Sequence, residues 1–378
     1  MMSKTWLSAL AAALLACAAV TVHAEEGVND DSILIGRTIG ITGIIAGPVK
    51  EMNEGANAYI AQVNREGGVY GRQIRILTLD DKFDPRLAAA NAEALIKNDH
   101  VFALFQCRGT PHTQRILPIL EANHVPLVAP GTGAAIFHTP VNHWVFNVRA
   151  KYQEEVAKGV EQFATVGFKR IGLLHVDDSF GIDGLEGFEK AMAAHHLKPA
   201  LIAKFARVNP DFVATARNVI EAKPDALIIV SSAKNTIGEI KAIRQLGNHM
   251  QIMTLSNNSS QAFIEELGDA GVGVILSQIT PPPDLSTSLL GEEFQKAAKA
   301  SGATVSYAAM EGYVSAKVLV EGLRRAGRNL SREGFVRGLE SMHHVDLGGI
   351  LITYGPDDHT GSEFVDLTMI GKGGRLVR

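Results

Sequence analysis

The chain has 378 residues, a formal net charge of −4 and 20% charged residues. At the usual size of roughly 100 to 200 residues per domain, this length predicts two domains with substantial cores. The basic residues are scattered singly along the chain, which argues against nucleic acid as a partner. Its 13 histidines and two cysteines show no ligand spacing of the HExxH or CxxC kind, so we expect no metal site and no cofactor.

The first 24 residues have the features of a secretory signal peptide. A positive start at Lys4 is followed by an uncharged apolar stretch to Val22 and by a small-residue exit before Glu25. This pattern is typical of export rather than of a membrane span, which needs roughly 20 apolar residues with suitable flanks. An alternative is that residues 14–17 form a lipoprotein box, in which Cys17 becomes a lipidated N-terminus.

Short apolar runs and longer amphipathic segments alternate along the mature chain. Strands are predicted at 33–35, 39–41, 73–79, 101–105, 126–128, 144–148, 171–175, 227–230, 252–255 and 272–276. Helices are predicted at 53–66, 84–98, 113–123, 152–166, 184–195, 211–223 and 236–246. Most of the strands are continuously apolar, as central parallel strands covered on both faces should be.

This alternation occurs twice, once before about Ala150 and once after it. It predicts an α/β fold with two doubly wound, Rossmann-like lobes. A proline run at 281–283 then interrupts the pattern, and further helices (289–301, 307–326 and 331–342) and strands near Ile350 and Phe364 follow. This order of elements is expected for a chain that forms most of one lobe, crosses to a second lobe and then returns to the first.

The motifs of enzymes with this architecture are missing from the sequence. No GxGxxG follows the first strand, and there is no GxSxG elbow and no P-loop. We therefore expect a binding protein and not an enzyme.

Several stretches carry a resemblance to a known family. They are Glu54 to Arg72, Asp80 to Pro85, Val125 to Gly131, His175 to Gly181 and Tyr307 to Ala309. In their order and spacing they resemble the leucine/isoleucine/valine-binding proteins of ABC transporters, over essentially the whole mature chain. Those proteins have the type I periplasmic binding fold.

The resemblance implies two lobes joined by a three-strand hinge, with crossovers near Arg149, Ile279 and Gly355. The implied boundaries are 32–148 plus 280–354 for the N-terminal lobe, and 149–279 plus 355–378 for the C-terminal lobe. It also implies a periplasmic protein that closes around a small molecule and delivers it to the permease and ATPase of an ABC transporter. A ligand sensor of the same fold, which signals to a partner protein, is the alternative.

Two loops of the N-terminal lobe are candidates for holding a ligand carboxylate. Arg108, Gly109 and Thr110 lie between a predicted strand and a helix, where free backbone N–H groups and hydroxyls suit an anion. An ordinary capped helix start has the same pattern, and an isolated arginine is often solvent-exposed. The second loop corresponds to a ligand-contacting turn in the resembled proteins and contains Gly131, Thr132 and Gly133.

In the C-terminal lobe, Phe180 takes the place of an aromatic residue that closes over the ligand. Two departures from the family affect the choice of ligand: Ala233 replaces a tyrosine, and Ser256 replaces the acid that pairs with the amino-acid ammonium. A buried ammonium without a carboxylate costs several kcal/mol. Either another acid substitutes, from among Asp177, Asp178 and Glu311, or the ligand is an aromatic or aliphatic acid rather than a branched-chain or other amino acid.

The disulfide of the family is also absent. Phe83 replaces its first cysteine, and Cys107 matches the second. We expect Cys107 to be a small buried residue of the core.

Overall fold

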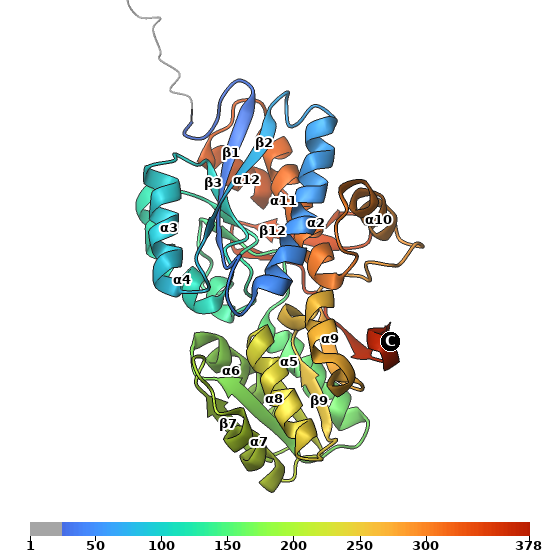
Figure 1. The fold of residues 1–378 in the computed structure, drawn as a ribbon. Helices are drawn as coiled ribbons and strands as arrows, with labels where there is room; N and C mark the ends of the chain where they lie inside the picture. Colours follow the sequence, from blue (N-terminus) through green and yellow to red (C-terminus); the bar gives the residue numbers. More distant parts are fainter. Residues whose placement is uncertain (1–24) are drawn as a thin grey trace, which may run out of the picture.

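The computed structural model describes residues 25–378 and shows two α/β lobes, one above the other in Figure 1. The predicted signal peptide and the alternative lipid anchor at Cys17 lie outside the described residues. Across residues 25–378, no helix combines the length and the apolar character that a membrane crossing requires.

The first lobe contains a parallel sheet of five strands in the order β2-β1-β3-β4-β5. The strands are β1 (Ser32–Ile39), β2 (Gln73–Asp80), β3 (Ala103–Phe105), β4 (Leu127–Val128) and β5 (Val145–Phe146). The helices α3 (Pro85–Lys97) and α4 (Thr110–Asn123) lie on one side of this sheet, and α2 (Ala46–Arg65) lies on the other (Figure 1). The strands are therefore covered on both faces, as their apolar sequences predict.

The C-terminal part of the chain returns to this lobe and completes it. It supplies α10 (Leu289–Ser301), α11 (Tyr307–Ala326) and α12 (Arg332–Glu340), followed by the small sheet of β11 (Val345–Asp346), β12 (Leu351–Gly355) and β13 (Asp358–Gly361). The helices α2 and α11 pack against each other along their length. Gly55 and Gly312 allow this approach, because a Cβ on either would lie within 2 Å of a backbone oxygen of the other helix.

The second lobe contains seven strands in the order β15-β14-β10-β9-β8-β6-β7. The parallel strands are β6 (Ile171–Val176), β7 (Leu201–Phe205), β8 (Ala226–Val230), β9 (Gln251–Thr254) and β10 (Ile275–Gln278), and β14 (Asp366–Ile370) and β15 (Leu376–Val377) add an antiparallel edge. The helices of this lobe are α5 (Tyr152–Thr165), α6 (Ser179–Ala194), α7 (Phe212–Glu221), α8 (Ala233–Gln245) and α9 (Gln261–Leu267). It also contains the short 3-10 helices η2 (Ser256–Asn258), η3 (Gly268–Gly271) and η4 (Lys372–Gly374), whereas η1 (Ala135–Phe137) belongs to the first lobe.

The structure confirms the predicted fold class of two doubly wound lobes. The chain passes between the lobes three times, after β5, after β10 and after β13. The residue boundaries of the lobes given above stay a prediction. The expected helix start at Asp84 is present, since its carboxylate accepts a 2.8 Å hydrogen bond from the N–H of Arg86 and Pro85 occupies the first turn.

Several elements differ from the sequence prediction, and β1, α2 and β7 show the physical reasons. β1 is one strand rather than two short runs, because the polar side chains of Arg37 and Thr38 are buried and hydrogen-bonded to neighbouring strands and loops. α2 begins at Ala46 rather than at residue 53, since Gly47 and Pro48 are tolerated in its first turn. β7 is not predicted, because it is an edge strand with alternating exposure and lacks a continuous apolar run.

Candidate functional site

The two predicted loops of the first lobe lie side by side at the carboxyl ends of β3 and β4. The N–H of Gly109 donates to the carbonyl of Gly131 at 3.2 Å, and the hydroxyls of Thr110 and Thr132 are 2.7 Å apart. Gly109 has φ 106°, and a Cβ there would lie 2.5 Å from Nδ1 of His112. Both the conformation and the space therefore require glycine at this position.

Arg108 is almost completely buried, with 5% of its surface exposed. Its guanidinium donates to the carbonyl of Asn257 in the second lobe at 2.9 Å and contacts the sulfur of Met52 at 3.4 Å. Among the described residues, no carboxylate lies within ion-pair distance of it. Burial consequently lowers the pKa of Arg108. The interpretation of Arg108 as a solvent-exposed side chain is wrong.

Arg149, which follows β5 at the hinge, is the centre of a buried polar network. It donates to Glu155 at 2.7 Å, to Glu311 at 3.2 Å and to the hydroxyl of Ser256 at 2.6 Å. Burial opposes its charge, but Tyr152, Glu311 and Glu155 together raise the pKa of Arg149 above its ordinary value. Ser256 therefore faces a cation that two acids hold in place.

The carboxylate of Glu155 accepts three hydrogen bonds from the protein. One oxygen accepts from Arg149, and the other accepts from the N–H of Ser256 at 2.9 Å and from the hydroxyl of Ser277 at 2.5 Å. The side chain is fully buried. Glu155 and Arg149 were not among the predicted site residues. The sequence could have indicated them, because both lie at the start of the segment that leaves the carboxyl edge of the first sheet, where ligands bind in this kind of fold.

The remaining predicted residues of the second lobe lie at helix starts. Phe180 is in the first turn of α6, which begins at Ser179 rather than at residue 184, and its ring centre lies 4.6 Å from that of Tyr152. The Arg149 guanidinium is stacked over the Tyr152 ring at 4.7 Å. A Cβ on Gly133 would come within 3.2 Å of Nε of Arg149. Phe180 therefore contacts the Arg149 network through Tyr152, and Gly133 lies directly against Arg149.

Ala233 is the first residue of α8 and is buried, but it makes no polar contact with the other candidates. Ser231, two residues before it, is linked to the site through Asn257, whose side chain donates to the carbonyl of Ser231 at 3.0 Å. Within residues 25–378, the buried hydroxyl oxygens of Ser179, Ser231 and Ser232 have no hydrogen-bond partner. Polar groups therefore remain available at the carboxyl edge of the second sheet.

The three acids named as substitutes for Ser256 differ in their surroundings. Asp177 is half-exposed and pairs with Lys204 at 3.1 Å. Asp178 caps α6 and pairs with Arg207. Glu311 is buried and shares Arg149 with Glu155. Of the three, only Glu311 belongs to the same network as Ser256.

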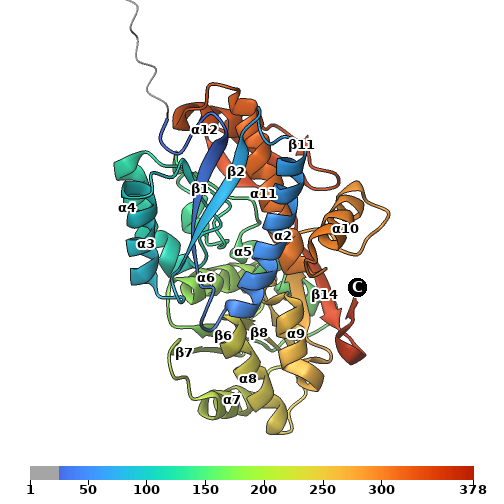
Figure 2. The same cartoon turned by 45° about the horizontal axis from the view of Figure 1, so that its top comes forward.

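Contacts between the lobes hold them close together. The carboxylate of Glu51 accepts from the N–H groups of Gln261 and Ala262 at 2.8 Å, where α2 meets α9 (Figure 2). The Asp183 carboxylate accepts from the N–H of Ala135 at 2.9 Å. The Arg207 guanidinium lies 5.1 Å from the centre of the Phe83 ring. The structure is therefore a closed arrangement of the two lobes.

Phe83 and Cys107, the positions that match the cysteines of the family, are both in the first lobe. Phe83 stacks on the ring of His112 with centres 4.3 Å apart. Cys107 is a free, fully buried thiol, and burial raises its pKa to about 12. Packing replaces the covalent link here, and the thiol is not reactive.

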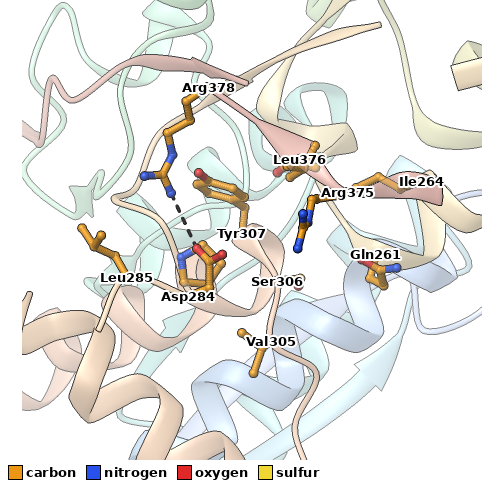
Figure 3. A pocket seen from close by; sticks show the side chains of 13 residues that line it. Gln261, Ile264, Asp284, Leu285, Val305, Ser306, Tyr307, Arg375, Leu376 and Arg378 are labelled. Atoms are coloured by element: carbon orange, nitrogen blue, oxygen red, sulfur yellow. Dashed lines mark ion pairs between the residues drawn. The ribbon is translucent and has the colours of Figure 1, made fainter. Parts of the chain in front are cut away.

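A cavity of about 450 Å³ lies at the junction of the lobes, away from these residues. It is formed by α9, the loop before α10, the start of α11 and the C-terminal strand (Figure 3). Arg378 and Asp284 face each other across it at 3.6 Å, and 79% of the Asp284 side chain is exposed. None of the predicted site residues lines this cavity, so size alone does not identify the solute site.

Comparison with known proteins gives partial and distant relatives. The leucine-specific-binding protein of Salmonella typhimurium is 24% identical over 213 residues, which are 51% of this chain and 56% of that protein. The Leu/Ile/Val-binding protein of Escherichia coli is 27% identical over 100 residues, which are 25% of this chain. That match spans about a quarter of the length of the relative.

Solved structures match almost the whole chain. A substrate-binding periplasmic protein of Ralstonia solanacearum has a TM-score of 0.86 with 28% identity, and the match covers 92% of this chain and 99% of that one. A possible leucine/isoleucine/valine-binding protein of Rhodopirellula baltica has a TM-score of 0.87 with 24% identity, covering 93% and 97%. The family model for periplasmic binding proteins matches residues 32–375. The chain belongs to this family of solute-binding proteins and has its type I fold.

Proposed function

We propose that this protein is the periplasmic substrate-binding component of an ABC transporter and that it binds a small carboxylate-bearing solute between its lobes. The observation that carries the proposal is Arg108, a buried guanidinium between the lobes that has no carboxylate within ion-pair distance among residues 25–378. Buried charges are normally paired, because an unpaired one loses its hydration without compensation. A carboxylate on the ligand supplies the missing partner and forms charge-assisted hydrogen bonds with this arginine.

The surrounding groups suit such a ligand. The N-terminus of α4 and the paired hydroxyls of Thr110 and Thr132 lie next to Arg108 and favour negative charge. Phe180, Ala233 and Met52 contribute apolar surface for the body of the solute. The named relatives bind leucine, isoleucine and valine, and one structural neighbour is a fatty acid ABC transporter substrate-binding protein. Both kinds of solute carry a carboxylate.

The mechanism is hinge closure and involves no reaction. The cavity beside Arg149 and Glu311 holds about 10 Å³, roughly the space that one water molecule needs. A solute enters only when the lobes separate, and contacts from both lobes then stabilise the closed form. The closed surface is what the permease recognises, and the signal peptide brings the protein to the periplasm.

The test is a thermal-shift and calorimetric screen of the mature protein from Glu25, first stripped of bound solute. The panel contains branched-chain and other amino acids, aliphatic acids and aromatic acids, each paired with its amide or methyl ester. A ligand that binds only the native state raises the melting temperature. We expect saturable shifts from free carboxylates and none from their amides or esters. Equal shifts from both forms, or none from any carboxylate, would refute the proposal.

A further inference from the structure

The acidic residues near Arg108 and Arg149 indicate whether the solute can carry an ammonium group. An ammonium group buried with the solute needs a carboxylate with a free oxygen. Glu155 accepts from Arg149, from the N–H of Ser256 and from Ser277, and Asp178 is held by Arg207 and by the N-terminus of α6. Asp177 is half-exposed at its ion pair with Lys204. Each of these three carboxylates therefore already neutralises a cation of the protein.

Two further acids were considered as partners for an ammonium. One oxygen of Glu311 binds Arg149 at 3.2 Å, and the side chain lines the narrow hinge cavity together with Met52. Asp183 accepts from Ala135 and from Gln153, and its second oxygen has no partner among the described residues. The hydrogen bond from Ala135 joins the two lobes, whereas the one from Gln153 lies within the second lobe. An ammonium beside Glu311 would lie next to the Arg149 guanidinium, and one beside Asp183 would lie where the Ala135 contact joins the lobes.

The donors of the site, in contrast, remain available. Nε of Arg149 is buried and has no acceptor in the described part of the chain. The same holds for the hydroxyls of Ser179, Ser231 and Ser232, and Arg108 lacks an anionic partner. Guanidinium N–H groups can only donate hydrogen bonds, and hydroxyls can donate one each. The serine hydroxyls and the Oδ1 of Asn257, which is unpartnered among residues 25–378, can also accept hydrogen bonds, so it is the two guanidinium groups that favour acceptor oxygens on the solute.

We infer, on the premise of the proposed function, that the solute is a carboxylic acid without an α-ammonium group: a 2-oxo, 2-hydroxy or unsubstituted acid. Arg108 binds its carboxylate. Arg149, fixed by Glu155 and Glu311 against Ser256, excludes the ammonium of an amino acid by like charge. The specificity-determining residues are then Arg149 and Ser256, because together they place a cation where an amino-acid ligand would need an acid.

The experiment uses sets of solutes that share a side chain and differ only at the α-carbon. Leucine is compared with 4-methyl-2-oxopentanoate and 4-methylpentanoate, and phenylalanine with phenylpyruvate and 3-phenylpropanoate, by isothermal titration calorimetry of the mature protein. We expect at least one acid without ammonium to bind, and the matching amino acid to bind about 100-fold more weakly or not at all, since a buried ammonium without a carboxylate costs several kcal/mol.

Other outcomes separate this inference from the proposed function. If an amino acid binds as tightly as its 2-oxo partner or more tightly, the inference is wrong and the carboxylate-binding function stands; Glu311→Gln and Asp183→Asn then identify the acid that holds the ammonium. If no acid of either kind binds here or in the wider screen, the proposed function itself fails.

A variant offers an independent measurement. Ser256→Asp restores an acid beside Arg149, and Ser256→Asn is its uncharged control of similar size. We expect the aspartate variant alone to narrow the preference for the 2-oxo acid over the amino acid, by about 10-fold, with circular dichroism confirming that both variants fold. An unchanged preference in a folded Ser256→Asp protein would argue against the role of this position.

Discussion

Two buried arginines lie between the lobes, and their surroundings are opposite. Arg149 is held by two glutamates and a hydroxyl, and these neighbours raise its pKa. In the described part of the chain, the Arg108 guanidinium hydrogen-bonds to a carbonyl and a thioether sulfur and forms no ion pair, and burial lowers its pKa. A buried cation that protein carboxylates neutralise belongs to the framework, whereas a buried cation without a carboxylate is a candidate site for an anion. We therefore expect Arg149 to organise the hinge and Arg108 to bind the proposed solute.

Removal of Arg149 should have the largest effect on stability. Arg149→Met leaves Glu155 and Glu311 buried without their cation, which should lower the free energy of unfolding by about 3 to 5 kcal/mol. Chemical denaturation monitored by circular dichroism measures the change. Arg75→Met is the matched control, because Arg75 forms an exposed 3.9 Å pair with Asp31 whose loss should cost less than about 1 kcal/mol. Similar losses in the free energy of unfolding for the two variants would show that Arg149 does not stabilise the hinge.

Arg108→Met should show the reverse pattern. No protein carboxylate loses its partner, so the free energy of unfolding should stay the same or rise, while affinity for the solute carboxylate should fall about 100-fold. Calorimetry with the tightest acid from the screen gives the affinity, and denaturation of the solute-free protein gives the stability. A large loss of stability with retained affinity would show that Arg108 is structural.

The sequence predicted the fold better than it predicted these roles. Continuous apolar runs indicated the parallel strands. The helix start after Arg108 and the family resemblance indicated the loops of Arg108 and Thr132 as candidates, in agreement with the rule that ligands bind at the carboxyl ends of such strands. The Arg149 network could not be predicted, because it joins residues from the hinge, α5, η2 and α11 that are up to 162 positions apart. Only the folded chain shows that Ser256 faces a cation.

Glu239 is an acidic counterpart of Arg108. Its carboxyl group is buried and has no hydrogen-bond partner in the described structure. Burial, with a smaller contribution from Asp211, raises its pKa to about 8. The folded state therefore holds this proton more tightly than the unfolded state, whose pKa is near 4.5. Stability from this group is complete below pH 4.5 and is lost as the pH rises toward 8, by up to about 1.4 kcal/mol per pH unit.

Glu239→Gln should abolish that loss. The variant keeps the shape of the side chain without its charge, so its free energy of unfolding should decline less between pH 6 and 8 than that of the parent. Asp81 and Asp183, whose pKa values burial raises to about 6, affect both proteins equally. Parallel pH profiles for the two proteins would show that Glu239 does not titrate in this range.

The contact of Phe83 with Arg207 joins the lobes outside both arginine environments and should have the smallest effect. Phe83→Leu removes the ring beneath the guanidinium, which contributes about 0.5 to 1 kcal/mol to closure, and solute affinity should fall about 2- to 5-fold. Phe83→Tyr keeps the ring and should retain the affinity of the parent. Calorimetry distinguishes the two. If leucine and tyrosine weaken binding equally, packing against His112 and not the interlobe contact explains the loss, and Phe83 then belongs to the framework with Arg149.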